Sequence, residues 1–377
     1  MWKVEVRSVT NVKRILHIVG GMNRGGAETF IMNMYRKLDR EKFQFDFVVH
    51  TETACDYDDE IIALGGRIFV RKRARLTGYR FAHELSKTII EHGPFHAIHS
   101  HVHFFSGITL RVACQTKIPI RIAHSHTDND GQSNSVLRNM YRGLMRRWIH
   151  RYGTDLLGCS AKACKALYSA SADHSKVIQN GIDLSIYEQL FNSAKDEQIN
   201  KLKHSQKIVH VGRFAEVKNH LFLLEIFCDL LKRLPNVTLV LVGDGPLLGK
   251  VKERARELNI QESVQFLGVR NDVPKILSEA AVMIMPSLYE GIPLVVIEAQ
   301  AAGLPIIVSE RISKDVDVGL GLVHTISLDR PHTDWVQKLV ELVEHKPVLS
   351  WKQIYESMWS KGYSVDRVVA EMRKIYD

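Results

Sequence analysis

Long hydrophobic runs are absent from this sequence. No stretch approaches the roughly 18 apolar residues that a membrane-spanning helix needs. The first residues, MWKVEVRSVTNVKR, are charged and contain no apolar core, unlike a secretory signal. We therefore expect a cytoplasmic protein, with attachment to the inner face of the cell membrane as an open alternative.

Cysteines are few, and short-period repeats and low-complexity segments are lacking. The five cysteines show no metal-ligand spacing, and an odd, scattered set is typical of reduced thiols. With 45% hydrophobic and 25% charged residues, the composition excludes a mainly disordered or fibrous chain. A chain of 377 residues is also longer than one core usually supports, which favours two domains.

Positive charge is unevenly distributed. The formal net charge is +9, and the whole excess lies in residues 1–185, while the rest of the chain is close to neutral. A basic half predicts an anionic partner, such as nucleic acid, a membrane surface or a phosphorylated substrate. Nucleic acid is disfavoured because no recognised nucleic-acid-binding module accompanies the charge.

Short apolar runs alternate with helical stretches along the whole chain. The runs that we expect to form strands are Ile15–Val19, Phe45–Val49, Arg67–Val70, Ala97–Ser100, Ile120–Ala123, Leu156–Cys159, Lys176–Gln179, Lys207–Val211, Val237–Val242, Val264–Leu267, Val282–Met285 and Ile306–Val308. Such alternation predicts parallel sheets covered by helices on both faces. The fold class is therefore α/β, with two Rossmann-like, doubly wound domains.

We place the two domains at residues 1–185 and 186–362. The boundary falls in residues 181–206, where the apolar periodicity fades, and residues 363–377 follow as an amphipathic helix. Ligands of doubly wound sheets bind outside the carboxyl ends of the strands. We therefore expect the active site in a cleft that the two domains face.

A glycine-rich segment, residues 20–26, follows the first expected strand and precedes a helix. Glycines allow close backbone approach, and a helix N-terminus attracts phosphate. The spacing is neither that of a dinucleotide-binding loop nor that of a Walker A loop, so the segment predicts either anion binding or only a tight turn.

Histidines cluster at the ends of two expected strands. His99, His101 and His103 form one group, and His124 and His126 form the other. Such side chains can donate hydrogen bonds to substrate hydroxyls or act as acid and base, or they can be structural. No diagnostic metal spacing accompanies them.

The helix expected over residues 135–152 carries an apolar stripe and five arginines without an acidic residue. The apolar residues are Leu137, Met140, Tyr141, Leu144, Met145, Trp148 and Ile149, and the arginines, placed on the other side, are Arg138, Arg142, Arg146, Arg147 and Arg151. This face is either a solvated surface or a binding surface for lipid headgroups or a diphosphate.

The second half offers two cations and two carboxylates. Arg213 follows a strand and Lys218 opens the next helix, an arrangement suited to a diphosphate. Glu290 precedes a helix that carries Glu298 about a turn and a half inside it. Two carboxylates can accept hydrogen bonds from sugar or ribose hydroxyls, although a lone glutamate is often structural.

Together these motifs resemble the retaining glycosyltransferases of family 4, which have the GT-B fold. The resemblance rests on the glycine-rich segment with Ala27-Glu28, on Asn180-Gly181-Ile182-Asp183, on Gly243-Asp244-Gly245-Pro246, and on residues 286–305, PSLYEGIPLVVIEAQAAGLP. It covers nearly the whole chain. Within the family, the last block looks most like enzymes of bacterial capsule and exopolysaccharide assembly.

The resemblance implies a role for each site residue. Arg213 and Lys218 would bind the diphosphate, Glu298 the ribose hydroxyls, and Glu290 the transferred sugar. Other donor-binding residues would be Gly25, Gly26, Val269, Arg270, Gly291, Ile292, Pro293 and Leu294. The sugar-contacting histidine of the family, in a His-Thr pair, corresponds best to His126, which would be catalytic, with His124 as the fallback. The acceptor-binding residues would be His124, Thr127, Arg138 and Arg142.

The resemblance also implies the partners. The donor would be a nucleotide sugar, with uridine expected from family habit, and the acceptor a saccharide or a lipid-diphosphate-linked saccharide bound by the basic first domain. The terminal helix would pack back onto that domain. No cofactor and no metal would be needed, because cations neutralise the diphosphate. The alternatives are a nucleotide-sugar epimerase with the same fold and a non-catalytic scaffold of a polysaccharide assembly complex.

Overall fold

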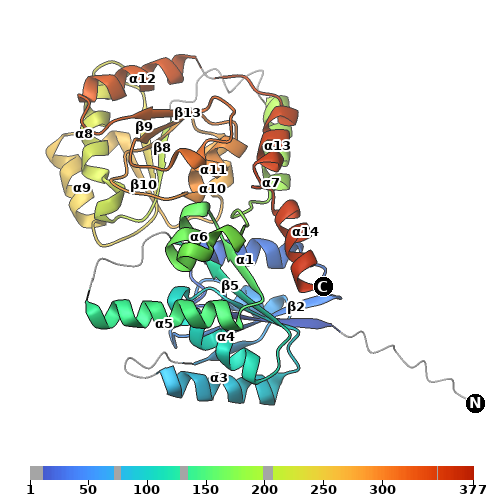
Figure 1. Ribbon diagram of the computed structural model, residues 1–377. Helices are drawn as coiled ribbons and strands as arrows, with labels where there is room; N and C mark the ends of the chain where they lie inside the picture. Colours follow the sequence, from blue (N-terminus) through green and yellow to red (C-terminus); the bar gives the residue numbers. More distant parts are fainter. Residues whose placement is uncertain (1–11, 72–77, 128–134, 198–206, 346) are drawn as a thin grey trace, which may run out of the picture. The chain divides into compact units, whose positions relative to one another are not determined.

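The computed structural model describes residues 12–71, 78–127, 135–197, 207–345 and 347–377. It divides into two compact units, one made of residues 1–181 and 365–377 and the other of residues 182–364. Residues 1–11, to which the sequence assigns no role, lie outside the described part. Each unit has its own sheet (Figure 1).

The first unit is built on a seven-stranded sheet whose paired strands are all parallel. In spatial order the strands are β3 (Ile68–Val70), β2 (Phe43–Val49), β1 (Lys13–Ile18), β4 (Ala97–Ser100), β5 (Ile120–Ser125), β6 (Asp155–Gly158) and β7 (Lys176–Val177). The chain runs outward from β1 in one direction and returns at β4 to run in the other, so the topological switch point lies between β1 and β4.

Helices cover both faces of this sheet. They are α1 (Gly26–Lys37), α2 (Asp58–Ala63), α3 (Gly78–His92), α4 (Ser106–Gln115), α5 (Val136–Tyr152), α6 (Ala161–Tyr168) and α14 (Val365–Tyr376), with short 3₁₀ turns η1 (His103–Phe105) and η2 (Ser169–His174). Alternate residues of a strand face opposite sides of the sheet. Ile15 and Val19 therefore lie in the core beneath α1 and α14, and Leu16 and Ile18 lie in the core on the opposite face.

The C-terminal helix α14 belongs to the first unit. Its buried face, which includes Val368, Met372 and Tyr376, joins the core beneath α1, and the two helices pack against each other (Figure 1). The amphipathic pattern read from the sequence therefore matches the buried side of this helix.

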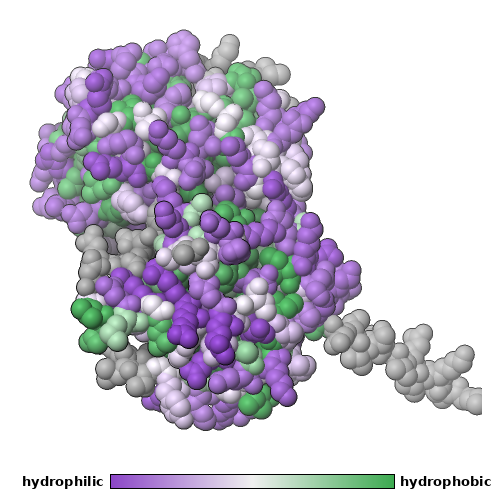
Figure 2. Space-filling view, viewed as in Figure 1, coloured by the Kyte–Doolittle hydropathy of each residue, from purple (hydrophilic) through white to green (hydrophobic). Residues whose placement is uncertain are grey.

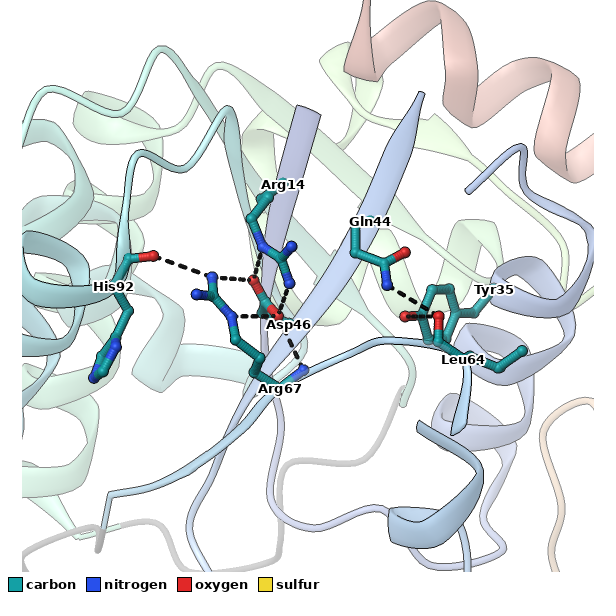
Figure 3. A network of polar contacts seen from close by, with 7 residues as sticks. All are labelled: Arg14, Tyr35, Gln44, Asp46, Leu64, Arg67 and His92. Atoms are coloured by element: carbon teal, nitrogen blue, oxygen red, sulfur yellow. Dashed lines mark hydrogen bonds and ion pairs between the residues drawn. The ribbon is translucent and has the colours of Figure 1, made fainter. Parts of the chain in front are cut away.

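A buried acid fixes one edge of the first unit. Asp46 on β2 is fully buried and accepts hydrogen bonds from the guanidinium groups of Arg14 and Arg67, at 2.6–3.1 Å (Figure 3). Burial alone would raise the pKa of Asp46, but the hydrogen bonds from the two arginines outweigh it and hold the pKa below its ordinary value. Arg67 also donates to the backbone carbonyl of His92, the last residue of α3. The carboxylate of Asp46 thus links β1, β2 and the chain before β3.

The second unit has a six-stranded sheet, also parallel in every pair. Its spatial order is β10 (Val264–Gly268), β9 (Thr238–Val242), β8 (Lys207–Val211), β11 (Val282–Met285), β12 (Ile306–Ser309) and β13 (Val323–Ile326). The order again reverses at the first strand, which places the switch point between β8 and β11.

Seven helices and three 3₁₀ turns complete the described part of this unit. They are α7 (Leu184–Glu197), α8 (His220–Leu231), α9 (Leu248–Glu257), α10 (Val273–Ser278), α11 (Leu294–Ala301), α12 (His332–Glu344), α13 (Trp351–Ser360), η4 (Glu216–Lys218), η5 (Gln261–Ser263) and η6 (Lys314–Val316). One core, with Val209 and Met285, lies on the α7 and α11 side, and another, with Ile208 and Trp335, lies beneath α8 and α12.

The prediction of two doubly wound parallel sheets is confirmed, and every expected strand is present. Two expectations about the chain path were wrong. Residues 184–197, expected as part of a polar connection, form helix α7, because Leu184 and Tyr187 bury one face of it. Strand β13 was not expected, because its four residues lie at the edge of the sheet and none is fully buried.

Candidate active site

Three of the predicted donor-binding residues of the second unit, Arg213, Lys218 and Glu290, lie at its switch point. Arg213 follows the end of β8, and Glu290 follows the end of β11, the strand that pairs with β8. In parallel sheets the carboxyl ends of neighbouring strands share one edge, so these loops lie side by side, where doubly wound sheets bind ligands.

Two hydrogen bonds hold these loops together. The backbone N–H of Leu288 donates to the carbonyl of Val217 at 2.8 Å, and Nδ2 of Asn219 donates to the carbonyl of Pro286 at 3.2 Å. Asn219 adopts a left-handed conformation with φ 56° between η4 and α8. Lys218 was expected to open the helix. It is instead the last residue of the 3₁₀ turn η4, so the backbone of this turn, and not that of α8, sets the position of the lysine.

The result is an ion pair between two predicted catalytic residues. Nζ of Lys218 lies 2.5 Å from Oε1 of Glu290, and only 14% and 19% of the two side chains are exposed. A Cβ on Gly212 would stand 3.1 Å from Cε of Lys218, so the glycine leaves room for the lysine to cross the end of β8. A cation and a carboxylate in this position suit a diphosphate and a sugar hydroxyl respectively.

Arg213 is exposed at the same strand end. Its loop is fixed by a hydrogen bond from the N–H of Phe214 to the carbonyl of Asp244 at 3.0 Å. Gly243 has φ 134°, and a Cβ there would stand 2.2 Å from the carbonyl oxygen of Gly212, so only glycine lets the loops after β8 and β9 approach so closely.

Glu298 lies in the middle of the eight-residue helix α11. Burial raises the pKa of its carboxyl group to about 7. Near neutral pH this side chain therefore switches between an acceptor-only carboxylate and a protonated form that donates one hydrogen bond. Its negative charge also contributes to raising the pKa of Tyr187, after burial, the main cause.

The segment before α11 is only partly buried. Gly291, Ile292, Pro293 and Leu294 are all of intermediate exposure, Pro293 caps the helix in an extended conformation, and a Cβ on Gly291 would meet open space. The N–H groups at the beginning of a helix have no partners inside the helix. This segment can therefore offer backbone donors to a ligand.

Val269 and Arg270 follow β10, farther from the switch point. The side chain of Val269 is 63% exposed. Arg270 forms two hydrogen bonds of 2.8 Å with the carboxylate of Asp272, which raise its pKa. The structure thus gives Arg270 a local carboxylate partner.

The glycine-rich segment in the first unit leads into α1, with Gly25 as the N-terminal cap. The N–H of Arg24 donates to Asp56 at 3.0 Å, and the N–H of Asp56 donates to Asn23 at 3.3 Å. A Cβ on Gly25 would stand 2.4 Å from Oε2 of Glu28. The carboxylate of Glu28 thus lies beside the start of α1, where the sequence predicts an anion; burial raises its pKa.

Five histidines line one face of the first sheet; we call them the histidine row: His17, His99, His101, His124 and His126. They lie at alternating positions of β1, β4 and β5 and directly after β4 and β5, on the face that α1 and α14 cover, and Phe30 of α1 packs against His124 and His126. Sequence reasoning missed His17 and the role of His99 and His101. The signal was the repeated His-Ser-His, which the two-residue period of a strand turns to one side.

The row contains the histidine groups that could hold a metal ion. Within the described residues they are His17 with His99 and His101, and His101 with His124 and His126, with ligand nitrogens within 4.8 Å of one another. The expectation that no metal is needed stays a prediction.

Helix α5 differs from its expected orientation. Leu137, Met140 and Leu144, expected in the core, are 79%, 68% and 45% exposed. Arg142, expected on the solvated face, is buried and donates to Asn139 at 3.1 Å, and Arg146 donates to the carbonyls of Ala166 and Leu167. The apolar stripe was wider than the face that the core accepts.

The remaining predicted acceptor residues lie near this helix in sequence. Thr127 is exposed after β5, and its carbonyl accepts from Ser125 at 3.3 Å. The N–H of Arg138 donates to the capping hydroxyl of Ser135 at 3.3 Å. No helix in the described part of the chain is long and apolar enough to cross a membrane.

Solved structures identify the architecture. The chain superposes on Anabaena HepE in complex with UDP with a TM-score of 0.74 and 15% identity, covering 96% of this chain and 99% of that one. It superposes on WaaG, a glycosyltransferase involved in lipopolysaccharide biosynthesis, with a TM-score of 0.63 and 14% identity over 95% and 99%. Two doubly wound units of this kind define the GT-B fold.

Sequence comparison then identifies the family. A model described as "Glycosyltransferase Family 4" matches residues 24–186, and one described as "Glycosyl transferases group 1" matches residues 192–315. The protein EpsF of Bacillus subtilis (strain 168) is 37% identical over 372 residues, which span 97% of this chain and 96% of EpsF. The chain belongs to the group 1 and family 4 glycosyltransferases, and it is a hexosyltransferase-type enzyme of class EC 2.4.

More distant relatives have printed names that describe their activities. The capsular polysaccharide biosynthesis glycosyltransferase CapH of Staphylococcus aureus is 24% identical over 372 residues, 96% of this chain and 98% of CapH. The Escherichia coli UDP-Gal:alpha-D-GlcNAc-diphosphoundecaprenol alpha-1,3-galactosyltransferase is 27% identical over 320 residues, 81% of each chain.

Proposed function

We propose that this glycosyltransferase moves a hexosyl group from a nucleoside-diphosphate sugar, with uridine as the base, to a saccharide or lipid-linked saccharide in the synthesis of a cell-surface polysaccharide. The names of CapH and of the galactosyltransferase of Escherichia coli support the substrate classes. The observation that carries the proposal is the Lys218–Glu290 pair at the switch point of the second unit.

The second unit would bind the donor. Lys218 and Arg213 contact the diphosphate, Glu290 the transferred sugar and Glu298 the ribose hydroxyls. As the glycosidic bond breaks, the departing diphosphate gains negative charge, and fixed cations stabilise that charge most strongly in the transition state. Since these cations neutralise the diphosphate, the reaction proceeds without a metal ion.

Transfer retains the anomeric configuration in this proposal. The acceptor hydroxyl attacks the face from which the diphosphate departs, the bond from the anomeric carbon to the phosphate oxygen breaks as the new glycosidic bond forms, and the departing phosphate takes the acceptor proton. The basic first unit would bind the acceptor. Gly25, Gly26 and His126 are the residues of that unit that we assign to the donor.

The test uses purified full-length protein and a panel of UDP-, GDP- and ADP-sugars. A ligand that binds the native state raises its melting temperature, and the sugars that bind are then incubated with lipid-linked acceptors while released nucleoside diphosphate is measured. Turnover with an acceptor supports the proposal. A changed sugar without any acceptor would indicate an epimerase, and binding without turnover a scaffold; either result would refute transferase activity.

Surface attachment to anionic lipid is part of the proposal. Leu137, Met140 and Leu144 share one exposed stripe of α5, spaced three and four residues apart, and Arg147 and Arg151 continue it. The exposed apolar residues form a hydrophobic patch at the beginning of α5 (Figures 1 and 2). Apolar side chains next to arginines fit the headgroup region of an anionic membrane.

Vesicle sedimentation tests this attachment. Binding is expected to vesicles that contain phosphatidylglycerol, to weaken with salt, and to be lost in Met140→Gln combined with Leu137→Gln. The matched control is Ile90→Gln, which removes a 74% exposed apolar side chain from α3. Equal binding of the α5 variant and the control would contradict the attachment.

A further inference from the structure

The histidine row is organised into two hydrogen-bonded chains. In the first chain, Nδ1 of His17 lies 3.1 Å from Nε2 of His101, and Nδ1 of His101 lies 2.8 Å from Nε2 of His126. In the second chain, the hydroxyl of Tyr376 lies 2.8 Å from Nδ1 of His99, and Nε2 of His99 lies 3.1 Å from Nδ1 of His124. The chains end side by side, because the rings of His124 and His126 stack with centroids 4.2 Å apart.

These distances are those of hydrogen bonds between ring nitrogens. Two nitrogens bound to one tetrahedral zinc ion, each at roughly 2.0–2.1 Å, would lie about 3.3 Å apart, farther than the 2.8 and 3.1 Å found in the first chain. A metal ion would therefore have to spread the rings.

All five rings are neutral near pH 7. Burial lowers the pKa of His17 to about 3, against an opposing effect of Asp46, and lowers the pKa of His126 to about 3. Burial, with the neighbouring histidines, also lowers the pKa of the remaining three rings well below the ordinary range. A neutral imidazole has one N–H donor and one acceptor nitrogen. A ring that accepts a hydrogen bond at one nitrogen therefore carries its proton on the other nitrogen, from which it donates to the next ring.

In the second chain, Tyr376 determines which atom donates in each hydrogen bond. Tyr376 is fully buried, and an O–H without an acceptor would be costly there. Because Nδ1 of His99 is the partner found for this hydroxyl, Tyr376 donates and Nδ1 of His99 accepts. His99 then donates from Nε2 to Nδ1 of His124, and His124 carries its proton on Nε2.

The apolar surroundings of His17 set the direction of the first chain. Its ring packs against Phe45 and Phe47, and its Nε2 is buried without a hydrogen-bond partner among the described residues. Either direction of donation leaves one N–H without a partner among the described residues, at Nε2 of His17 or at Nδ1 of His126. An unpartnered donor is most costly in a fully buried side chain, and His17 is fully buried whereas His126, after β5, is only partly buried. The proton therefore resides on Nδ1 of His17, His101 donates from Nδ1 in turn, and His126 carries its proton on Nδ1.

We propose that His17, His101, His99 and Tyr376 are positioning residues, and that their two chains fix His126 as a neutral hydrogen-bond donor at Nδ1 and His124 as one at Nε2. The proposal rests on the proposed function for the statement that His126 contacts the donor substrate. It assigns the last turn of the C-terminal helix to the site of the first unit. It also favours the hydrogen-bond donor over the acid or base role that the sequence leaves open, because Nε2 of His126 already accepts from His101 and burial lowers the pKa of the ring.

Ring ¹⁵N spectra of the full-length protein, labelled at histidine, test the tautomers directly. A neutral ring locked in one tautomer gives one nitrogen signal of the protonated type and one of the unprotonated type, whereas a ring that exchanges gives two averaged signals. We expect locked rings, with the proton on Nδ1 of His101 and His126 and on Nε2 of His99 and His124. The opposite tautomer at His126 or His124, averaged signals, or metal bound to these rings in stoichiometric amount would overturn the proposal.

Variants separate positioning from simple loss of stability. Tyr376→Phe removes only the hydroxyl and should unlock His99 and His124, while Tyr168→Phe, the matched control, removes another buried hydroxyl, bonded to the carbonyls of Ala123 and Leu157, and should leave all five rings locked. His17→Leu should unlock His101 and His126, and His17→Asn, whose amide can replace the Nδ1 donor, should restore them. An unlocked His126 in the asparagine variant and a locked one in the leucine variant would contradict the first chain.

The kinetic readout connects the tautomers to transfer. If two tautomers of His126 become equally populated in His17→Leu, only about half of the molecules are competent, so kcat should fall about twofold or more, with recovery in His17→Asn. Absence of transfer with every donor would refute the proposed function and leave the ¹⁵N result standing. Locked rings with an unchanged kcat in His17→Leu would instead refute the positioning role.

Discussion

Nζ of Lys218 and Oε1 of Glu290 are 2.5 Å apart in a half-buried ion pair of the second unit. The carboxylate of Glu290 thus holds the ammonium group of Lys218 in a defined position. Preorganised charge of this kind costs little reorganisation during the reaction.

Lys218→Ala should lower turnover on the order of 10²-fold or more, because the developing charge on the diphosphate loses a fixed cation. Steady-state kinetics with released nucleoside diphosphate as the signal measure it. The control is Lys207→Ala, which breaks an exposed ion pair with Glu279 in the same unit and should leave turnover within about twofold, since exposed pairs contribute little. Near-normal turnover in Lys218→Ala would contradict the charge argument, and the same size of loss is expected in Arg213→Ala.

Glu290→Gln should separate affinity from turnover. The substitution keeps the size of the side chain but frees Lys218 from its ion pair, so the nucleoside diphosphate should bind at least as tightly as before. If Glu290 contacts the transferred sugar, kcat should fall with little change in the Kd of the nucleoside diphosphate, measured by calorimetry. A weaker Kd together with normal kcat would assign Glu290 to holding Lys218 alone.

Glu298 should make both nucleotide binding and stability depend on pH. Its pKa is raised to about 7, so the folded protein holds a proton that the unfolded chain releases near pH 4.5. The stabilising effect is therefore complete below pH 4.5 and is lost as the pH rises through 7. Glu298→Gln should be more stable than the wild type at pH 8, on the order of 1–3 kcal/mol, and equally stable at pH 4.5.

The Glu298→Gln substitution should also weaken the binding of the nucleotide. A carboxylate accepts from both ribose hydroxyls, and the lost charged hydrogen bond should cost about tenfold in affinity at pH 8. Wild-type affinity should fall as the pH drops through 7 and that of Glu298→Gln should stay level. If the nucleotide affinity of the two proteins changed with pH in the same way, Glu298 would not be a ribose-binding residue.

The positions of the strands, apart from β13, were predictable because most of them are short apolar runs closed by glycine or polar residues. The segment between β11 and α11 was predictable too, since residues 286–305 form an uninterrupted motif that places Glu290 before a helix. The ion pair of Lys218 was not predictable from spacing, because it depends on the left-handed Asn219 and on the hydrogen bond between Leu288 and Val217. Periodicity alone also misplaced Leu137 and Met140, since it identifies an apolar stripe but not how much of it the core covers.

The contacts within the histidine row were also not predictable from the sequence. His-Ser-His after two strands was visible in the sequence, but His17 lies 82 residues before the first of these histidine pairs and Tyr376 lies in the last helix. Only the parallel pairing of β1 with β4, in which His17 and His99 are register partners, brings them together. Contacts between residues so distant in sequence leave no local pattern.

Asp46→Asn should destabilise the first unit by about 3 kcal/mol, because the carboxylate that receives both Arg14 and Arg67 would lose its charge in a buried position (Figure 3). Urea denaturation at pH 7.5 measures the change. Asp39→Asn is the control, since it breaks an exposed pair with Lys42 and should cost less than about 1 kcal/mol. Because the pKa of Asp46 is lowered, the effect should persist down to pH 5; equal stability of the two variants would show that the network contributes little.

The histidine row should make the first unit sensitive to acid. An unfolded histidine takes up a proton near pH 6.5, whereas burial lowers the pKa of His17 and His126 to about 3 in the folded protein. Their stabilising effect is complete above pH 6.5 and is lost as the pH falls toward 3, at about 1.4 kcal/mol per pH unit for each fully buried ring. The free energy of unfolding should therefore fall steeply between pH 6.5 and 5.

His99→Asn should reduce this slope by about the contribution of one ring, whatever the stability of the variant itself, and Tyr168→Phe should not change the slope. An unchanged slope in His99→Asn would mean that the folded protein protonates the row, contrary to its burial.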